Sequence, residues 1–245
     1  RGAGQSHHSR QAGETKPGRH GVNDNPHWLI IMGNRVLYTL LYVWVKTCAL
    51  LPMGILYVFS DALSFIIYRV ARYRLKVVRH NMRHAFPDKT EQERRELERR
   101  FYRHFADYIV ETIKLAGISH EELLRRSRLS NPEMVKPLLA QGHTSLILMM
   151  GHYGNWEWFT GFPSCFGGGL KVYQIYRPLN NKAFDKLFIF LRTRFGAFGI
   201  RKKDVVREVV RLTREKQPSL FVFIADQTPS PANLHYWTTF LNQES

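Results

Sequence analysis

The sequence predicts an α/β fold, a mixed and partly parallel sheet flanked by helices, with a membrane-associated helical segment on its N-terminal side. Short apolar stretches that alternate with amphipathic patterns predict the sheet. A long apolar stretch followed by basic residues predicts the helical segment. We expect three regions: a disordered, non-native extension over 1–31, a membrane-anchoring segment with a basic flank over 32–80, and the α/β domain over 81–245.

Composition narrows the choice of partners. The 245 residues include 36 Lys and Arg against 20 Asp and Glu, which gives a formal net charge of +16. This excess indicates a polyanion or a negatively charged membrane surface as partner, without choosing between nucleic acid and lipid. The two cysteines, Cys48 and Cys165, provide no disulfide framework and no metal-ligand spacing, so no metal site is expected.

The N-terminal part divides into a polar and an apolar stretch. Residues 1–27 are rich in Gly, His, Ser and Arg without a hydrophobic period, which is typical of disorder, and we expect the natural start near Met32. The stretch Val36–Phe59 contains one charged residue, Lys46, and is long enough to span a bilayer. A basic run then follows at Arg69, Arg72, Arg74, Lys76 and Arg79.

Three interpretations of the apolar stretch remain open. It forms a single tilted helix that spans the membrane, with the basic run on the cytoplasmic side. Alternatively, Pro52-Met53-Gly54 divides it into two shorter helices that lie in the interface, with basic residues on lipid phosphates. The third interpretation is a helical hairpin buried in the core. Apolar runs of this length are uncommon in soluble domains, which favours the two membrane interpretations over the third.

A long helix begins after Phe86-Pro87-Asp88. Thr90 and Glu93 have the spacing of a capping box, in which each side chain satisfies a free backbone amide at the helix start. Apolar residues then recur at every fourth position and predict a buried stripe. The stripe consists of Leu97, Phe101, Phe105, Ile109 and Ile113.

The second half of the chain alternates strand and helix patterns. Apolar runs predict strands at Ser145–Met150, Lys171–Tyr176 and Ser219–Ala225, and the first and third are wholly apolar, as expected of strands covered on both faces. Helices are predicted over about 182–193 and about 204–216. This alternation indicates that at least part of the sheet is parallel.

Each predicted strand ends in polar or ionisable side chains. His152 to Glu157 follow the first strand, Arg177 the second, and Asp226-Gln227 the third. Ligand sites of open α/β sheets lie at the carboxyl ends of the strands. We therefore expect these residues to converge on one site.

His152 is the candidate general base. A neutral imidazole can remove a proton from an attacking hydroxyl when its other nitrogen is held by an acceptor. Glu157, five residues on and past a turn with glycine, could curl back as that acceptor. The nucleophile would then be a hydroxyl of the substrate. A His and a Glu at this spacing are also compatible with a purely structural pair.

The other strand-end residues suit anions. Arg177 and Arg192 could each bind a phosphate or stabilise an oxyanion, since the guanidinium fork matches such groups. A strand-end salt bridge between Arg177 and Asp226, and an exposed position for Arg192, are the structural alternatives. Asp226 could orient one of the arginines, and Gln227 is expected to form loop hydrogen bonds.

Several motifs in order resemble those of a known family. Gly151–Glu157 resembles the histidine-x4-acid motif of glycerolipid-type acyltransferases, in the glutamate form found in the late acyltransferases of lipid A biosynthesis. The resemblance extends from about Val36 to the C-terminus. The other motifs that carry it are Asn81, Ala85-Phe86-Pro87, Glu93-Arg94, Tyr176–Lys182, Asp185, Arg192, Arg194 and Ala225-Asp226-Gln227.

The resemblance implies a glycerolipid-acyltransferase-like fold and an enzyme of the bacterial inner membrane whose active site faces the cytoplasm. Such an enzyme transfers a lauroyl- or myristoyl-type chain from acyl carrier protein, without a cofactor, to a hydroxyl of a lipid A precursor. By matching position, His152 and Glu157 would be the catalytic pair. The residues expected to bind substrate are Asn155, Arg177, Arg192, Asp226 and Gln227.

The resemblance also implies the partners: acyl-acyl carrier protein, a phosphorylated glycolipid acceptor and inner-membrane lipid, with no nucleic acid. Family members continue beyond the segment that resembles Phe240–Gln243, so 81–245 is expected to be a C-terminally truncated acyltransferase domain. Two other functions remain possible. One is a phosphatidylinositol-mannoside or glycerophospholipid acyltransferase with the same chemistry, and the other a non-enzymatic basic protein that binds membranes or nucleic acid.

Overall fold

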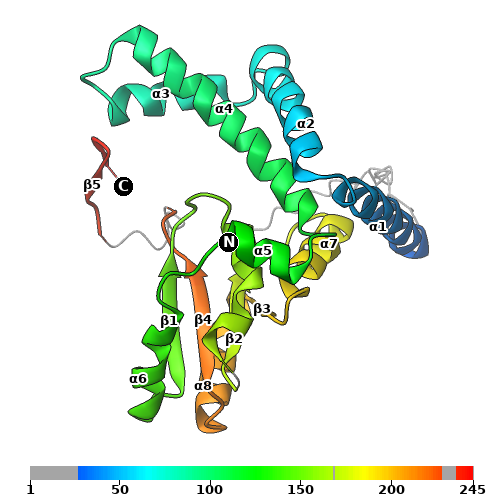
Figure 1. The fold of residues 1–245 in the computed structure, drawn as a ribbon, viewed down its shortest axis with the longest axis vertical. Coiled ribbons are helices and arrows are strands. Elements are labelled where there is room, and N and C mark those ends of the chain that lie inside the picture. The colour runs from blue at the N-terminus through cyan, green and yellow to red at the C-terminus, as the bar shows by residue number, and fades with distance from the viewer. Residues whose placement is uncertain (1–26, 168, 228–235, 245) are drawn as a thin grey trace, which may run out of the picture.

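A computed structural model describes residues 27–167, 169–227 and 236–244. A four-stranded sheet lies at one end of the molecule, and α2, α3 and the first half of α4 lie at the other (Figure 1). The helices are α1 (His27–Ala49), α2 (Met53–Phe65), α3 (Leu75–Ala85), α4 (Glu91–Lys114), α5 (His120–Arg126), α6 (Val135–Ala140), α7 (Lys182–Thr193) and α8 (Val205–Arg214), and a π-helical turn, Ile66–Val70, continues α2. The strands are β1 (Ser145–Met150), β2 (Lys171–Tyr176), β3 (Phe198–Arg201), β4 (Ser219–Ile224), β5 (Thr239–Phe240) and β6 (Gln243–Glu244).

The main sheet has the order β1-β4-β2-β3, and every neighbouring pair is parallel. The three predicted strands are confirmed, and the mixed α/β fold with them. The sequence analysis missed β3, because its four residues include Gly199 and show no alternation. Full coverage of β1 was a wrong expectation: Ile147 and Met149 are 64% and 63% exposed, so the described residues leave one face of this edge strand open.

The capping box at the start of α4 forms as predicted. The Thr90 amide donates to the Glu93 carboxylate at 2.8 Å, and the Glu93 amide donates to the Thr90 hydroxyl at 3.3 Å. These two bonds satisfy amides that have no partner within the helix and fix where the helix begins.

The buried stripe of α4 lies one residue away from the predicted one. Buried are Glu98, Tyr102, Ala106, Val110 and Lys114, whereas Phe101 of the predicted stripe is 39% exposed. Polar side chains occupy this stripe because each finds a partner, as buried polar groups must. The Glu98 carboxylate accepts from Arg79 at 2.9 Å, and the Tyr102 hydroxyl donates to the Tyr73 carbonyl at 2.6 Å. A pattern of apolar residues alone could not reveal these pairings.

The apolar N-terminal stretch forms two helices and not one. α1 ends at Ala49 and α2 begins at Met53, immediately after Pro52. This break is expected, because a proline cannot continue a preceding helix. α1 starts at His27, so the last residues of the 1–31 region are helical, and residues 1–26 lie outside the described part. Within the described part, one continuous helix, Met53–Val70, is long and apolar enough to cross a membrane.

Two lysines join α1 to α4 where both helices end. Lys46 on α1 donates to the carbonyl of Ala116, just past α4, at 3.0 Å. Lys114 on α4 donates to the carbonyl of Ala49, the last residue of α1, at 2.9 Å. Carbonyls at helix C-termini lack intrahelical partners and carry partial negative charge, so each ammonium stabilises the other helix's end. These two hydrogen bonds fix the end of α1 against the end of α4.

Candidate active site

His152 lies just past β1 and is held by Asp226, just past the neighbouring strand β4. The Asp226 carboxylate accepts the backbone amide of His152 at 2.7 Å through one oxygen and contacts ring Nδ1 at 2.5 Å through the other. Gly151 allows this approach, because a Cβ there would lie 3.2 Å from the carboxylate. Gly154 adopts φ 59°, a left-handed conformation suited to glycine, and so lets the chain turn after His152.

The charge state of Asp226 suits this arrangement. Partial burial would raise the pKa of the Asp226 carboxyl, but the hydrogen bonds from the amide and ring of His152 outweigh it, and the net effect lowers that pKa. The carboxylate therefore remains ionised at neutral pH and assigns the Nδ1 proton to its own side of the ring. The His152 side chain is 27% exposed, so the other nitrogen, Nε2, is accessible to a substrate.

Glu157 does not contact His152, contrary to the expected pairing. Its carboxylate forms a bidentate ion pair with Arg192 on α7, with contacts of 2.8 Å to Nε and 2.5 Å to a terminal nitrogen. The 3₁₀ turn Trp156–Gly161 starts directly after Asn155 and turns the Glu157 side chain into the interior, where it is 4% exposed. No local signal in the sequence predicts this 3₁₀ turn, so the direction of the Glu157 side chain could not be predicted from the spacing alone.

Arg192 is half-buried by this pairing, with its side chain 24% exposed, and is not the exposed helix residue of the alternative interpretation. Burial alone would lower the pKa of its guanidinium, but the hydrogen bonds and charge of Glu157 raise it above the ordinary value. The Arg192 guanidinium therefore stays charged. It fixes the loop after His152 to α7.

Aromatic rings connect the loop to α4. The ring of Trp156 meets the imidazole of His152 edge-on with centroids 4.6 Å apart, and on its other side it stacks on Tyr108 at 4.5 Å. Burial, followed by the charge of Glu157, raises the pKa of Tyr108 to about 12, so its hydroxyl remains protonated. The sequence analysis missed Tyr108, although a tyrosine beside the buried stripe of a long helix is the kind of signal that could have found it.

Of the remaining predicted residues, Gln227 lies beside the imidazole and Asn155 lies in its loop, whereas no hydrogen bond or ion pair among the described residues joins Arg177 to this centre. Gln227 places its amide nitrogen 3.4 Å from Nε2 of His152, a long contact at the open side of the ring. Arg177 is exposed at the end of β2, and Asp226 holds His152, not an arginine. Asn155 directs its amide nitrogen to Glu111 of α4 at 2.9 Å. Substrate binding by these residues stays a prediction.

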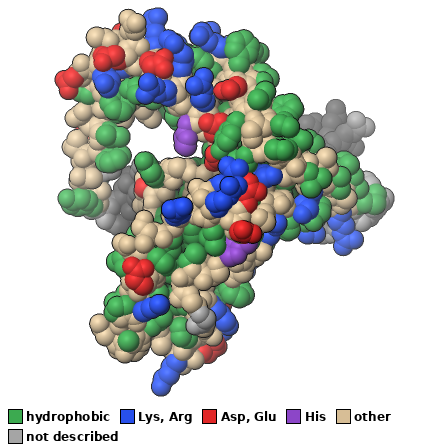
Figure 2. All heavy atoms as spheres, in the orientation of Figure 1, with side chains coloured by type: hydrophobic (Ala, Val, Ile, Leu, Met, Phe, Trp, Pro, Cys, Tyr) green, Lys and Arg blue, Asp and Glu red, His purple; other side chains and the backbone are tan. Residues whose placement is uncertain are grey.

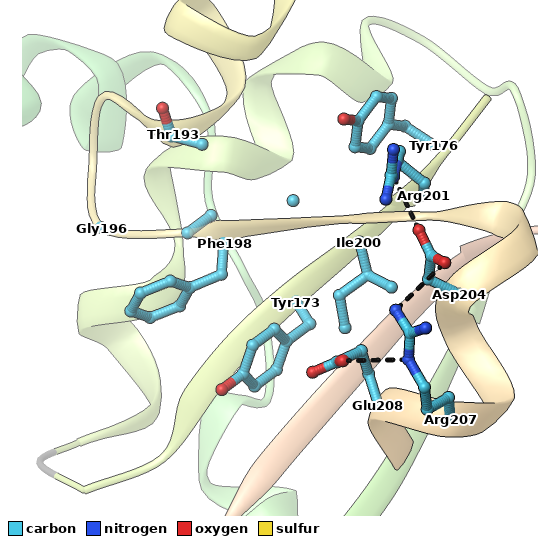
Figure 3. Close-up of a pocket in the computed structure, with 12 residues that line it drawn as sticks. Tyr173, Tyr176, Thr193, Gly196, Phe198, Ile200, Arg201, Asp204, Arg207 and Glu208 are labelled. Atoms are coloured by element: carbon cyan, nitrogen blue, oxygen red, sulfur yellow. Dashed lines mark hydrogen bonds and ion pairs between the residues drawn. The ribbon is translucent and has the colours of Figure 1, made fainter. Parts of the chain in front are cut away.

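A separate cleft of about 590 Å³ opens at the β3 edge of the sheet. Figure 3 shows Arg201 and Arg207 pointing toward Asp204, with Tyr173 and Ile200 beside them. The cleft contains none of the residues predicted for the site. Since β3 and β1 lie on opposite edges of the sheet, this cleft is distinct from the His152 centre.

A histidine held by a carboxylate at adjoining strand ends of a parallel sheet is an arrangement suited to general-base chemistry, in the place where α/β enzymes carry their sites. The family model described as "Bacterial lipid A biosynthesis acyltransferase" matches residues 28–237. The chain belongs to this family and is an enzyme that transfers acyl groups in lipid A biosynthesis. A comparison with curated proteins gives no match.

Proposed function

We propose that this enzyme transfers a fatty acyl chain of the lauroyl or myristoyl type from acyl carrier protein to a hydroxyl of a phosphorylated lipid A precursor. The observation that carries the proposal is the double hydrogen bond between Asp226 and His152, which leaves Nε2 as the acceptor nitrogen on the open side of the ring, with only the long 3.4 Å contact to Gln227. The family supports the acyl transfer and the lipid A pathway. The donor, the chain type and the role of His152 belong to the proposal.

The reaction needs one base and no protein nucleophile. Nε2 of His152 accepts the proton of the acceptor hydroxyl while its oxygen forms a bond to the thioester carbonyl carbon. The tetrahedral intermediate collapses, the carbon–sulfur bond breaks, and the thiolate of the carrier leaves. The imidazolium returns the proton to that thiolate. Asp226 holds the ring orientation throughout and stabilises the imidazolium.

In this proposal Glu157 is not the partner of His152, and the other site residues bind substrate or support the loop. Glu157 supports the site indirectly, because its carboxylate binds Arg192 and orients it. Arg177 and Arg192 supply cations for the phosphates of the acceptor or for the oxyanion. Gln227 borders the imidazole, with its amide facing the open nitrogen, and Asn155 lies in the loop that carries His152 and binds Glu111 of α4.

The same proposal includes an interfacial position on the cytoplasmic side of the bacterial inner membrane. Figure 2 shows hydrophobic side chains gathered over α2, and basic side chains interspersed with acidic ones over α3 and the start of α4. On α2 and the turn that follows it, Val58, Phe59 and Phe65 are 58–69% exposed. α2 also packs along α4, which favours a helix lying in the interface over one that leaves the domain to span the bilayer.

The domain division follows from this placement. We propose that residues 32–80 form the membrane-facing segment and that 81–245 carry the acyltransferase site. The net charge of +16 favours an acidic carrier protein as donor and a phosphorylated lipid as acceptor, since both are negatively charged. No observation in the described residues calls for a nucleic-acid partner.

The test is acyl transfer by the purified protein from lauroyl- and myristoyl-acyl carrier protein to a lipid A precursor in detergent, with products read by mass spectrometry. His152→Ala should abolish transfer, and His143→Ala, a change at an exposed histidine, should retain it. Asp226→Asn should lower kcat by about three to four orders of magnitude, as the loss of the orienting acid does in a hydrolase triad. Turnover by His152→Ala at the wild-type rate would refute the proposal, and preference for a glycerophospholipid acceptor would replace its substrate.

A further inference from the structure

One turn of α4 faces the loop that carries His152. The Trp158 indole donates to the backbone carbonyl of Glu111 at 3.2 Å, and Tyr108 stacks on Trp156 at 4.5 Å. Trp156 and Trp158 belong to the 3₁₀ turn that begins four residues after His152. The loop is therefore attached to α4 from one side, as it is to α7 through Glu157 from the other.

The Glu111 carboxylate joins two segments that are far apart in the sequence. Its Oε2 accepts the side-chain amide of Asn155 at 2.9 Å, and its Oε1 accepts the hydroxyl of Tyr57 at 2.9 Å. Tyr57 lies on α2, the helix with the exposed apolar face, and Asn155 lies in the His152 loop. Neither bond involves a backbone group of α4, so neither belongs to the hydrogen bonds that form the helix.

Asn155 depends on this carboxylate for its orientation. Its amide nitrogen makes one further, longer contact of 3.4 Å to the Tyr108 carbonyl. Its oxygen Oδ1 is buried and has no hydrogen-bond partner among the described residues, so only the nitrogen side holds the group. Asn155 directly precedes Trp156, whose ring packs against the imidazole. A shift at Asn155 therefore moves the surface on which His152 rests.

We propose that Glu111 is a positioning residue for acyl transfer, which holds the His152 loop through Asn155 and ties it to the membrane-facing helix α2 through Tyr57. This inference rests on the proposed function. It assigns Glu111 no contact with substrate. A positional error of about 1 Å at a reacting group costs up to about a hundredfold in rate, so this bridge has kinetic consequences although it lies outside the reaction.

The first test replaces Glu111→Ala and measures steady-state acyl transfer. We expect kcat to fall by about tenfold to a hundredfold, with KM for the acyl carrier protein changed by less than about threefold, because substrate contacts remain. Glu96→Ala on the same helix is the matched control. Among the described residues the Glu96 carboxylate binds Arg99 and Arg100 alone, and it is 49% exposed, so the kcat of this variant should equal that of the wild type.

The second test exchanges donor and acceptor in the hydrogen bond between Asn155 and Glu111. Asn155→Asp places two acceptors opposite each other and should reduce kcat as strongly as Glu111→Ala. Adding Glu111→Gln restores a donor: the Gln amide nitrogen donates to the new aspartate, and its oxygen still accepts from Tyr57. The double variant should recover about tenfold in kcat relative to Asn155→Asp, within the range that one misplaced contact costs. A general loss of stability at Asn155 would not be repaired in this way.

The outcomes separate this inference from the function on which it rests. A wild-type protein that transfers no acyl chain in this assay overturns the proposed function. An active wild type with a Glu111→Ala variant of equal kcat overturns the positioning role. If Glu111→Ala does not fold, the second test decides. A double variant Asn155→Asp, Glu111→Gln that is no more active than Asn155→Asp overturns the inference, and a higher kcat of the double variant supports it.

Discussion

The Asp226 carboxylate binds His152 twice, through one oxygen to the backbone amide at 2.7 Å and through the other to ring Nδ1 at 2.5 Å. The two residues are 74 positions apart and meet because β1 and β4 are neighbouring parallel strands. One side chain thus fixes both the main chain and the imidazole of the proposed base. Glu157, the acid nearest in sequence, instead holds Arg192.

Acid should remove the stabilising effect of Asp226. The pKa of this carboxyl in the folded protein lies below its ordinary value of 3.8, so its contribution to stability is present above that pH. It is lost as the pH falls through the lower, folded-state pKa. Urea unfolding at pH 7 should therefore show Asp226→Asn to be less stable than the wild type, and the difference should shrink at pH 3. A difference that grows toward acid pH would contradict this sign.

Removing one partner of the Glu157–Arg192 ion pair should lower the free energy of unfolding more than replacing both partners with apolar residues. Arg192→Ala leaves the Glu157 carboxylate, 4% exposed, without its partner and should lower the free energy of unfolding by about 3–5 kcal/mol. The double variant Glu157→Leu, Arg192→Met removes both charges and should recover most of that loss. Chemical denaturation of both proteins measures the two values. Equal stability of Arg192→Ala and the wild type would show that the pair is unimportant for folding.

Three of the four strands of the main sheet, and the polar residues at their ends, could be predicted from the sequence, because apolar runs and the turns after them are local signals. Their partners could not. The contacts of His152 with Asp226 and of Glu157 with Arg192 depend on strand order and on a 3₁₀ turn, which no local period encodes. The same holds for Glu111, whose two contacts come from segments 44 and 54 residues away.

Close packing between α1 and the end of α4 should make Gly117 sensitive to substitution. A Cβ at this position would lie 2.8 Å from the Cβ and 2.9 Å from the carbonyl oxygen of Ala49. Gly117→Ala should destabilise the protein by about 1–3 kcal/mol, as overpacking does, and displace α1. Gly54→Ala is the control, since nothing lies within 4 Å of its Cβ. Thermal unfolding compares them, and an equal midpoint for the two variants would refute the contact.

The basic turn after α2 should contribute to membrane binding. Arg69, Arg72 and Arg74 are exposed beside Ile66 and Val70, which are 51% and 68% exposed. Each arginine near an anionic surface is worth about 1 kcal/mol, so replacing all three with glutamine should weaken binding to phosphatidylglycerol vesicles by on the order of a hundredfold. The effect should fade at high salt.

A control triple variant separates this turn from general charge. Changing Arg207, Arg211 and Arg214 of α8 to glutamine removes the same charge at the opposite end of the molecule (Figure 1). Vesicle co-sedimentation should show near wild-type binding for this control. Equal losses in the two triple variants would mean that net charge, and not the turn after α2, drives binding.

The assignment of Asp226 as the acid partner of His152 is tested most directly by the ¹⁵N chemical shifts of the imidazole, recorded at a pH where the ring is neutral. Our account predicts that the wild type and Glu157→Gln carry the proton on Nδ1, with Nε2 free. In Asp226→Asn a single amide oxygen replaces the two carboxylate oxygens that bind the His152 backbone amide and the Nδ1 proton. The side-chain NH₂ can donate to Nδ1 instead, so the tautomer should redistribute toward Nε2–H. A retained Nδ1 proton in Asp226→Asn together with a redistributed one in Glu157→Gln would contradict the account.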